Sequence, residues 1–439
     1  MKISLQRIIG TCLPLFMFVY NLNWKLGAVC NIFLIIIFST QFLDGTIKKI
    51  SNLCMLWGGY IAVFAVLLQI LRNYELTISY VVGYVLAVMI LLKGIDRVTF
   101  RYILSSLKKL SIIQAFGIFL QYLMPNIYYA VMSILVEEPT RNSIMFRVQE
   151  GYYTGFSREV SLTIVFLIIG VGLFIAELLF DSKSQSSHTK RKIIIEVLIL
   201  ILAILLTGKR GQPLFCLLAL LITYLIYSKN RMKVIKILGG TAVFGIIIAA
   251  TYNYWERIPS LSRFVQLIGN ILNNSDVAIL TTGRTEIYEA AIKLFEKNKM
   301  FGIGWNNFKN SFGSDIWFSR FDVHNCYLQV LCETGYIGAT LFYLLVLATI
   351  IKVLQCGVLN SNVIRYGKGI TPFCIFYTIF FLAYCITGTN LYEYSYYIIF
   401  FISVTQIEKE LRNHKEKKLL ASGGNYEKNF NRRSILRRT

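Results

Sequence analysis

The sequence predicts an all-α integral membrane protein that crosses a bilayer about twelve times. Hydrophobic residues make up 56% of the 439 positions and charged residues only 15%, whereas about a quarter of a soluble domain is charged. The chain also contains many apolar runs close to the ~20 residues that a helix needs to cross a bilayer. Helices satisfy their backbone hydrogen bonds internally, so they are the expected spanning element.

Taken in order, the expected spans are apolar runs separated by charged or turn-forming segments. They cover residues 8–22, 26–43, 52–71, 76–92, 109–125, 160–180, 193–207, 213–227, 234–253, 325–351, 369–387 and 391–407. Residues 1–408 therefore form one polytopic membrane domain with two large outer loops, at 126–158 and 254–323. Residues 409–439 are rich in Lys, Arg and Asn, which favours a disordered basic tail drawn to anionic lipid.

Basic residues determine the expected orientation. The net charge is +22, and about two thirds of the 45 Lys and Arg residues fall in alternate connections and the tail. Positive charge collects on the cytoplasmic side of a membrane, so both termini are expected in the cytoplasm, and no nucleic-acid partner is needed to explain the charge. The N-terminus shows no cleavable signal. The nine cysteines lie mostly in apolar runs without a C-x-x-C pair, so neither disulfides nor a zinc site is expected.

Several arginines go against the charge trend and fall on the outer side: Arg141, Arg147, Arg158, Arg210, Arg257, Arg263, Arg284 and Arg320. Arginine suits bidentate recognition of phosphate, although a single outer arginine is more often simply solvated. Arg210 lies in the turn TGKRGQP between apolar runs of about 14 residues, roughly 21 Å of helix. That length places the turn below the outer surface, where a charge is usually functional. Pro213 is expected at the first position of the returning helix; the alternative is an ordinary hairpin with snorkelling side chains.

The second large loop contains an amphipathic pattern and the only histidine predicted on the outer side. Arg284 begins a predicted helix that lies on the outer leaflet, and Trp305 with Phe308 is expected to anchor the following glycine-rich turn at the interface. His324 follows Asp322, a suitable N-cap for the next span. A helix N-terminus disfavours imidazolium, so His324 is a candidate proton acceptor that Asp322 could orient; a structural histidine is equally compatible with the spacing.

These segments, taken together, resemble the O-antigen polymerase/ligase superfamily of bacterial membrane glycosyltransferases. The resemblance rests on ordered motifs: T-G-x-R-G at 207–211, G-R at 283–284, G-x-G-W at 302–305, H-N-x-Y-L-Q at 324–329 and E-x-G-x-x-G at 333–338. It covers residues 207–345 well and the preceding chain weakly. Lys209 departs from the pattern, where a small residue is expected, and leaves the role of Arg210 open.

The resemblance implies a GT-C-like fold and a metal-independent transfer of glycan from an undecaprenyl-pyrophosphate donor to a hydroxyl acceptor, without a cofactor. Arg210 and Arg284 would bind the pyrophosphate, with Arg147 contributing. His324 would position or deprotonate the acceptor, with Asp322 and Glu159 as further candidate bases. Expected partners are lipid-linked oligosaccharides, membrane lipid, a chain-length regulator and a flippase.

Three activities remain open from the sequence. A polymerase would join repeat units into O-antigen, capsule or exopolysaccharide in the bacterial cytoplasmic membrane, and this interpretation is preferred. A ligase would pass finished glycan to another acceptor. A flippase would move the lipid-linked glycan, but it is expected to carry paired charges at mid-membrane and short outer loops, whereas here the charges cluster on the outer loops.

Overall fold

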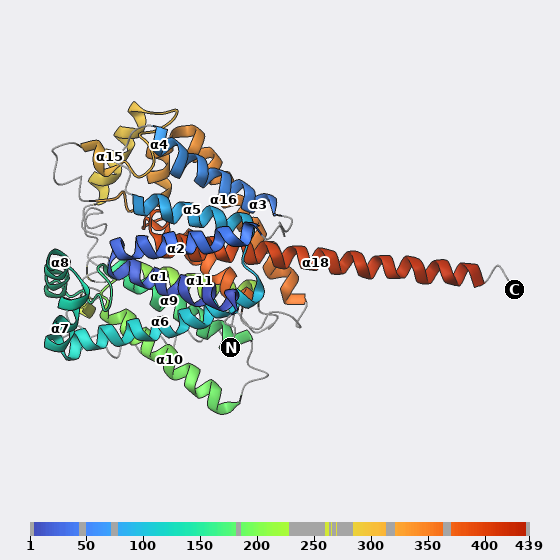
Figure 1. Cartoon of the computed structure of the whole chain (residues 1–439), viewed down its shortest axis with the longest axis horizontal. Coiled ribbons are helices and arrows are strands. Elements are labelled where there is room, and N and C mark those ends of the chain that lie inside the picture. The colour runs from blue at the N-terminus through green and yellow to red at the C-terminus, as the bar shows by residue number, and fades with distance from the viewer. Residues whose placement is uncertain are drawn as a thin grey trace.

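The computed structural model describes residues 4–43, 50–71, 78–180, 186–227, 284–312, 321–362 and 370–435, with residues 260–262, 265 and 269. Within these residues, all regular secondary structure is helical, as predicted (Figure 1). The first half contributes α1 Leu5–Leu22, α2 Trp24–Leu43, α3 Asn52–Tyr60, the π-helical η1 Ile61–Leu67, α4 Leu68–Leu71, α5 Ile78–Lys93, α6 Arg97–Leu123, α7 Pro125–Leu135 and α8 Glu138–Gln149.

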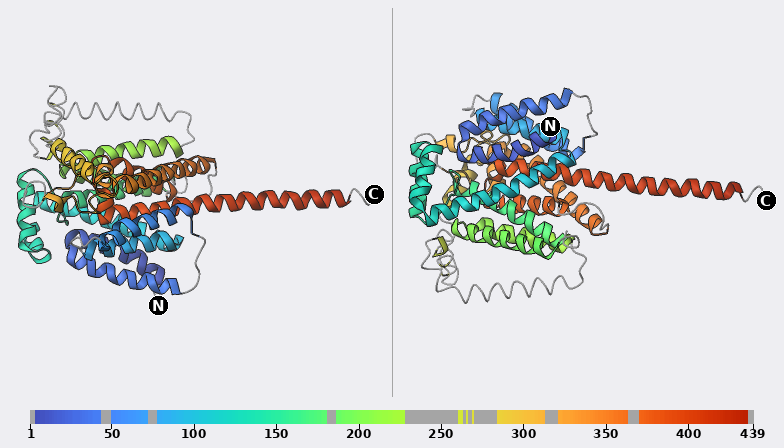
Figure 2. Two further views of the ribbon diagram at one scale, coloured as in Figure 1. Left: turned by 90° about the horizontal axis from the view of Figure 1, so that it is seen from above. Right: turned by 60° about the horizontal axis from the view of Figure 1, so that its bottom comes forward.

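The second half supplies the helices around which the functional residues lie. They are α9 Val160–Phe180, α10 Ser187–Leu206, α11 Gly211–Tyr227, α15 Arg284–Lys297, α16 Cys326–Asn362, α17 Ile370–Tyr384 and α18 Tyr394–Ile435, with the short 3₁₀ helices η3 Lys309–Phe312 and η5 Asn390–Tyr392. Most of the long helices run along one direction, and α7 and α8 lie across one end of them (Figure 2). That end is called the site end below.

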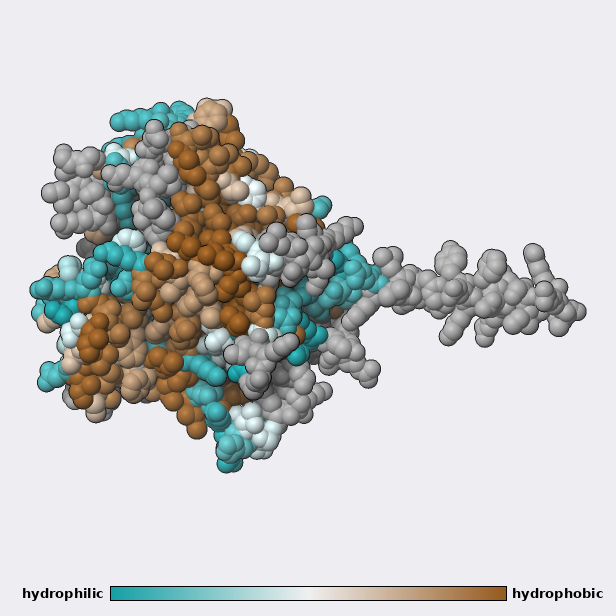
Figure 3. Space-filling model, viewed as in Figure 1, coloured by the Kyte–Doolittle hydropathy of each residue, from teal (hydrophilic) through white to brown (hydrophobic). Residues whose placement is uncertain are grey.

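The described helices have the character of membrane spans. Four are long and apolar enough to cross a bilayer: Leu5–Leu22, Arg97–Leu123, Val160–Phe180 and Cys326–Leu359. Five shorter apolar helices accompany them, and a broad apolar belt covers the visible face between polar ends (Figure 3). The chain is therefore consistent with a polytopic membrane protein. The predicted span at 234–253 lies outside the described residues, and the number of spans stays a prediction.

Helix α9 forms the centre of the bundle. It is apolar on every side, and 78% of its most apolar window is buried inside the protein. A helix that is hydrophobic all round requires partners all round, and α9 packs against α6, α10 and α17. A buried polar side chain of α6 is satisfied by α9 and by the connection before it: the amide of Gln114 donates to the Thr163 hydroxyl at 3.1 Å and to the Ser157 hydroxyl at 3.0 Å.

Two predicted boundaries differ from the observed ones for a physical reason. Helix α6 begins at Arg97, well before the predicted residue 109, because the Asp96 carboxylate caps it by accepting from Val98 N at 2.8 Å and Thr99 N at 3.0 Å. Helix α18 continues through Ile435, where the composition favours a disordered tail. The tail's Glu, Lys and Leu residues are strong helix formers, which supports continuation of the helix beyond residue 409.

The end opposite the site end holds the N-terminal residues and the exit of α18. Leu5, Asp96 and Arg412 line one cavity of about 660 Å³ there. Figure 1 shows α18 leaving the body at this end. The first described residues and the basic C-terminal helix therefore lie at the same end of the bundle, as the predicted topology requires.

Candidate active site

The T-G-K-R-G turn joins α10 to α11 at the site end. Gly208 has φ +69°, and a Cβ there would lie 2.6 Å from the carbonyl oxygen of Gly151. Only glycine therefore lets the turn approach the 150–159 connection so closely. The prediction that Pro213 begins the returning helix is wrong, because α11 begins at Gly211. Pro213 lies within the first turn, where its missing N–H costs no helix hydrogen bond.

Lys209, the residue that departs from the family pattern, faces the other charged groups of the site. Its ammonium lies 5.7 Å from the centroid of the Tyr152 ring. Burial lowers the pKa of Lys209 to about 8, with Arg147 and Arg284 lowering it further and Glu159 opposing them. Lys209 therefore lies among the arginines that the sequence assigned to phosphate binding. Its neighbour Arg210 is half-buried, and burial lowers its pKa as well.

Arg284 is the first residue of α15, as predicted. Its Nη1 donates to the carbonyl oxygen of Thr387 at 3.2 Å, so it is held against the connection between α17 and α18. The expectation that this amphipathic helix places its apolar face on the outer leaflet is wrong. Ile287 and Ala291 are buried against α16, and the ring of Phe295 packs edge-on against Tyr336 at 4.9 Å.

The glycine-rich turn after α15 docks on a kink in α16. Gly335 interrupts α16 with φ 64° and ψ −167°. At this point Gly304 N donates to the Glu333 carbonyl at 2.8 Å and Tyr336 N donates to the Lys299 carbonyl at 2.7 Å. The G-x-G-W and E-x-G-x-x-G motifs are therefore two halves of one backbone contact.

Glu333 and Trp305 complete this contact as structural residues. The buried Glu333 carboxylate accepts from Asn306 N at 2.7 Å and from Phe308 N at 3.3 Å, so it fixes the end of the turn. Trp305 Nε1 donates to Tyr84 Oη at 3.0 Å, and its ring stacks on Tyr392 at 4.9 Å. The prediction that Trp305 and Phe308 anchor at the interface is wrong, since they are 2% and 1% exposed.

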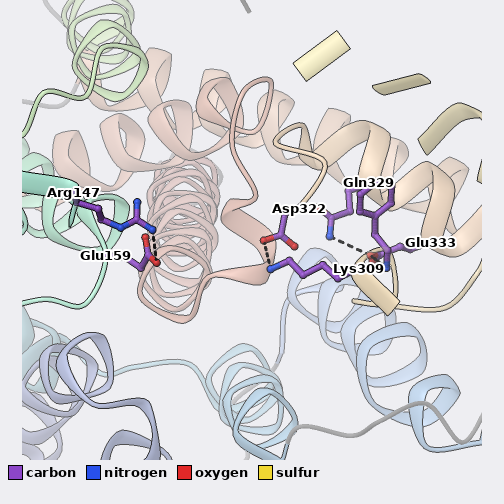
Figure 4. A network of polar contacts seen from close by, with 7 residues as sticks. Arg147, Glu159, Lys309, Asp322, Gln329 and Glu333 are labelled. Atoms are coloured by element: carbon purple, nitrogen blue, oxygen red, sulfur yellow. Dashed lines mark hydrogen bonds and ion pairs between the residues drawn. The ribbon is translucent and has the colours of Figure 1, made fainter. Parts of the chain in front are cut away.

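Two ion pairs occupy the site (Figure 4). Arg147 Nη2 lies 3.0 Å from Glu159 Oε1, and Lys309 Nζ lies 2.8 Å from Asp322 Oδ2. The prediction that Asp322 caps α16 is wrong. Asn325 performs this role, because its Oδ1 accepts from Leu328 N at 3.1 Å. The charge of Asp322 instead acts on Lys309. Burial lowers the pKa of Lys309, but the attraction and the hydrogen bond of Asp322, together with the charges of Glu393 and Glu159, outweigh it and raise the pKa.

His324 lies among the charged groups of the site. Its φ of 56° is in the left-handed region, which is uncommon outside glycine and signals a constrained turn. Burial lowers the pKa of His324 to about 4; Arg284, Lys209 and Lys309 lower it further, while Asp322 opposes them. His324 is therefore neutral at pH 7, as the sequence predicted, although burial rather than the helix N-terminus is the main cause.

The sequence analysis missed Glu393 and Lys309, and it noted Arg158 only as one of the outer arginines, without a role of its own. Arg158 lies 5.4 Å from the Tyr20 ring centroid, and its buried Nη1 makes no hydrogen bond to any described residue. Glu393 precedes α18 and is half-buried, and the charges of Arg158, Lys309 and Asp322 all act on it. One signal was available: Glu393 is a lone acid within the aromatic stretch NLYEYSYY, at the start of the predicted span 391–407.

The described residues contain no group of three or more His, Cys, Asp or Glu placed to hold a metal ion. All nine cysteines are free. What the site offers instead is positive charge: Arg147, Arg158, Lys209, Arg284 and Lys309 against Glu159, Asp322 and Glu393. A positive surplus at partly buried positions suits binding of an anion such as a phosphate, and neutral His324 beside it suits a hydroxyl.

Comparison with known protein families gives a match to part of the chain. No curated protein matches the chain. The model of one family, described as O-antigen ligase, matches residues 195–343, a range that contains Arg210, Arg284, Asp322 and His324 but not Arg147. The matched segment is similar to this family, and it contains all of the motifs by which the chain resembles the O-antigen polymerase/ligase superfamily.

Proposed function

We propose that this chain is a polymerase that joins undecaprenyl-pyrophosphate-linked oligosaccharide repeat units into O-antigen, capsular polysaccharide or exopolysaccharide. The reaction would take place at the outer face of the cytoplasmic membrane, with both chain termini in the cytoplasm. The family match supports glycosyl transfer of the ligase or polymerase kind. The observation that carries the proposal further is the cluster of cationic side chains next to His324.

The cationic side of the site fits the leaving group. Arg284 is fixed by the Thr387 carbonyl, and the charges of Lys209 and Arg147 act on one another. In this proposal these residues, with Arg210, bind the pyrophosphate. Its negative charge increases as the bond to the sugar breaks, and cations already fixed at low dielectric stabilise that change most. No metal ion is part of this proposal.

The neutral side of the site fits the acceptor. His324 is neutral at pH 7 and accepts a hydrogen bond from the attacking hydroxyl, which orients it toward the donor. Asp322 holds Lys309 in place and also acts electrostatically on His324. Loss of the imidazole in His324→Ala is therefore expected to abolish product formation in a folded protein.

A ligase that transfers glycan to a separate acceptor is the second candidate, because the matching family model is described as O-antigen ligase. Both activities use the same donor chemistry and the same cations. They differ in the acceptor, so the acceptor has to be varied in the test.

The test uses purified full-length protein in detergent with lipid-linked oligosaccharide extracted from the source cells, without metal or nucleotide. A ladder of products on a gel, lost in Arg284→Ala and retained in Lys293→Ala, is the expected result. Lys293 is a matched control because it is exposed on the same helix. A single product that needs an added acceptor would replace the polymerase by the ligase. Transport of the lipid-linked glycan across vesicles without any new product would overturn both.

A further inference from the structure

Glu393 belongs to a connection that is tied to both sides of the site. The Thr387 carbonyl accepts from Arg284, and the Cys385 carbonyl accepts from Cys326 N at 2.8 Å, two residues after His324. Glu393 itself is held where α18 begins, because its carbonyl accepts from the backbone N–H of Tyr396 at 2.9 Å. The connection therefore keeps Glu393 in a fixed relation to the donor-binding arginine and to the histidine turn.

The pairing of the three carboxylates sets Glu393 apart from the other two. Glu159 is paired with Arg147 at 3.0 Å, and Asp322 is paired with Lys309 at 2.8 Å. Glu393 forms no ion pair within 4.0 Å with any of the residues that the structure describes. A cation in contact with a carboxylate favours its charged form and makes it a poorer proton acceptor. Of the three carboxylates, Glu393 is therefore the one that accepts a proton most readily.

The surroundings of Glu393 support this assignment. Burial raises the pKa of Glu393 to about 7; Arg158 and Lys309 oppose the rise, while Asp322 and Glu159 add to it. A catalytic base works best when its pKa lies near the operating pH. The pKa of His324, lowered to about 4 by burial, makes the histidine a weak base by comparison.

We propose that Glu393 is the catalytic base that accepts the proton of the acceptor hydroxyl, while neutral His324 positions that hydroxyl. This inference rests on the proposed glycosyl transfer. In the step, the acceptor oxygen forms a bond to the anomeric carbon of the donor as the carbon–oxygen bond to the pyrophosphate breaks. The leaving pyrophosphate keeps the electron pair of that bond, and the hydroxyl proton moves to the Glu393 carboxylate. Glu393 later releases the proton to water.

The test measures the rate of product formation between pH 5.5 and 8 for the wild type, Glu393→Gln and Glu393→Asp, using the extracted lipid-linked oligosaccharide. The wild-type rate is expected to rise through about pH 7 as Glu393 loses its proton. Glu393→Gln, close in shape, should be slower by about 10²–10⁴-fold without that rise. Glu393→Asp should recover part of the rate and keep a pH-dependent rise. Binding of the lipid-linked donor, measured by thermal shift, should be unchanged in both variants.

Asp322→Asn is the matched control. Asp322 raises the pKa of Glu393, so its neutralisation should move the pH-dependent rise to lower pH without removing it. A Glu393→Gln protein with the wild-type rate and the wild-type pH profile would overturn the assignment of Glu393 alone. A wild-type protein that forms no product at any pH would instead count against the proposed function.

Discussion

Replacement of Gly335 by alanine is expected to undock the glycine-rich turn from α16 and inactivate the protein. A Cβ at Gly335 would lie 2.4 Å from the carbonyl carbon of Met300 and 2.5 Å from its oxygen. Both atoms are backbone, so no side chain can swing aside to make room. The backbone dihedrals, φ 64° and ψ −167°, also lie in a region that is essentially reserved for glycine.

The energetic cost follows from these contacts. Holding alanine in such a conformation costs about 1–3 kcal/mol. Relief of the clash separates the two segments and breaks the bonds from Tyr336 N to Lys299 O, 2.7 Å, and from Ile337 N to Met300 O, 3.4 Å. Each such bond contributes about 0.5–1.5 kcal/mol net. The docked state is therefore destabilised by about 2–6 kcal/mol relative to the undocked state.

Thiol labelling of Cys332, read by mass spectrometry, provides the assay. Cys332 is buried beneath the turn, and its carbonyl accepts from Ile303 N at 3.1 Å. If labelling requires undocking, a loss of 2 kcal/mol or more raises its rate by at least about 30-fold. Gly59→Ala is the control, because a Cβ at Gly59 would meet no atom within 4 Å. Equal labelling rates in Gly335→Ala and Gly59→Ala would refute the reasoning.

Three further predictions concern the cations and the buried tryptophan. Arg210→Lys should lower the rate of product formation by about tenfold or more, because an ammonium cannot form the bidentate fork; a wild-type rate would reduce Arg210 to a general positive charge. The pKa of Lys209, lowered to about 8, means that its charge is present below pH 8 and lost above it. Donor binding in a thermal-shift titration should therefore weaken as the pH rises from 7 to 9, and Lys209→Arg should remove this dependence. Trp305→Phe removes the 3.0 Å hydrogen bond to Tyr84 and should lower the stability in thermal melting by about 1–3 kcal/mol, whereas an unchanged melting temperature would show that this bond contributes little.

The positions of the helices could be predicted from the sequence, because apolar runs of span length report directly on burial in lipid or protein. Their ends were less predictable. A charged first turn interrupts the apolar pattern, so the start of α6 at Arg97 could not be recognised from hydrophobicity. A proline is also not always the first residue of a helix, since α11 begins two residues before Pro213. The 234–253 span and Arg257, Arg263 and Arg320 lie outside the described residues.

Residues of the candidate site could be predicted from the sequence only where they lie in a motif or next to one. His324 and Arg284 belong to motifs and Asp322 lies two residues before His324, and the structure places the charges of Arg284 and Asp322 close enough to act on His324. The pairing partners could not be predicted, because Arg147 with Glu159 and Lys309 with Asp322 depend on how connections fold together. Trp305 looked like an interface anchor for the same reason: sequence alone does not show the aromatic partners that bury it.

Arg158 and Glu393 lie outside the matched range of 195–343 and carry no motif. Glu393 is separated from His324 by α16 and α17, so only the three-dimensional return of the chain brings it to the site. A single acidic residue in an aromatic stretch at the end of a span is nevertheless a usable signal. Burial of a charge there is energetically unfavourable, so such a residue usually has a function.

The balance of charges in the site has a consequence for the end of the reaction cycle. Arg210 aside, the site holds five cations and three carboxylates that pair with or act electrostatically on one another, which leaves a surplus of two positive charges. A lipid pyrophosphate still joined to its sugar carries about two negative charges, and it gains about one more when that bond breaks, because it keeps the electron pair of the bond. In the proposed step Glu393 accepts a proton and becomes neutral at the same moment, so the surplus of positive charge in the site rises from two to three. The site therefore binds the lipid pyrophosphate product most tightly just after transfer. Its affinity for this product falls when Glu393 releases its proton and regains its negative charge.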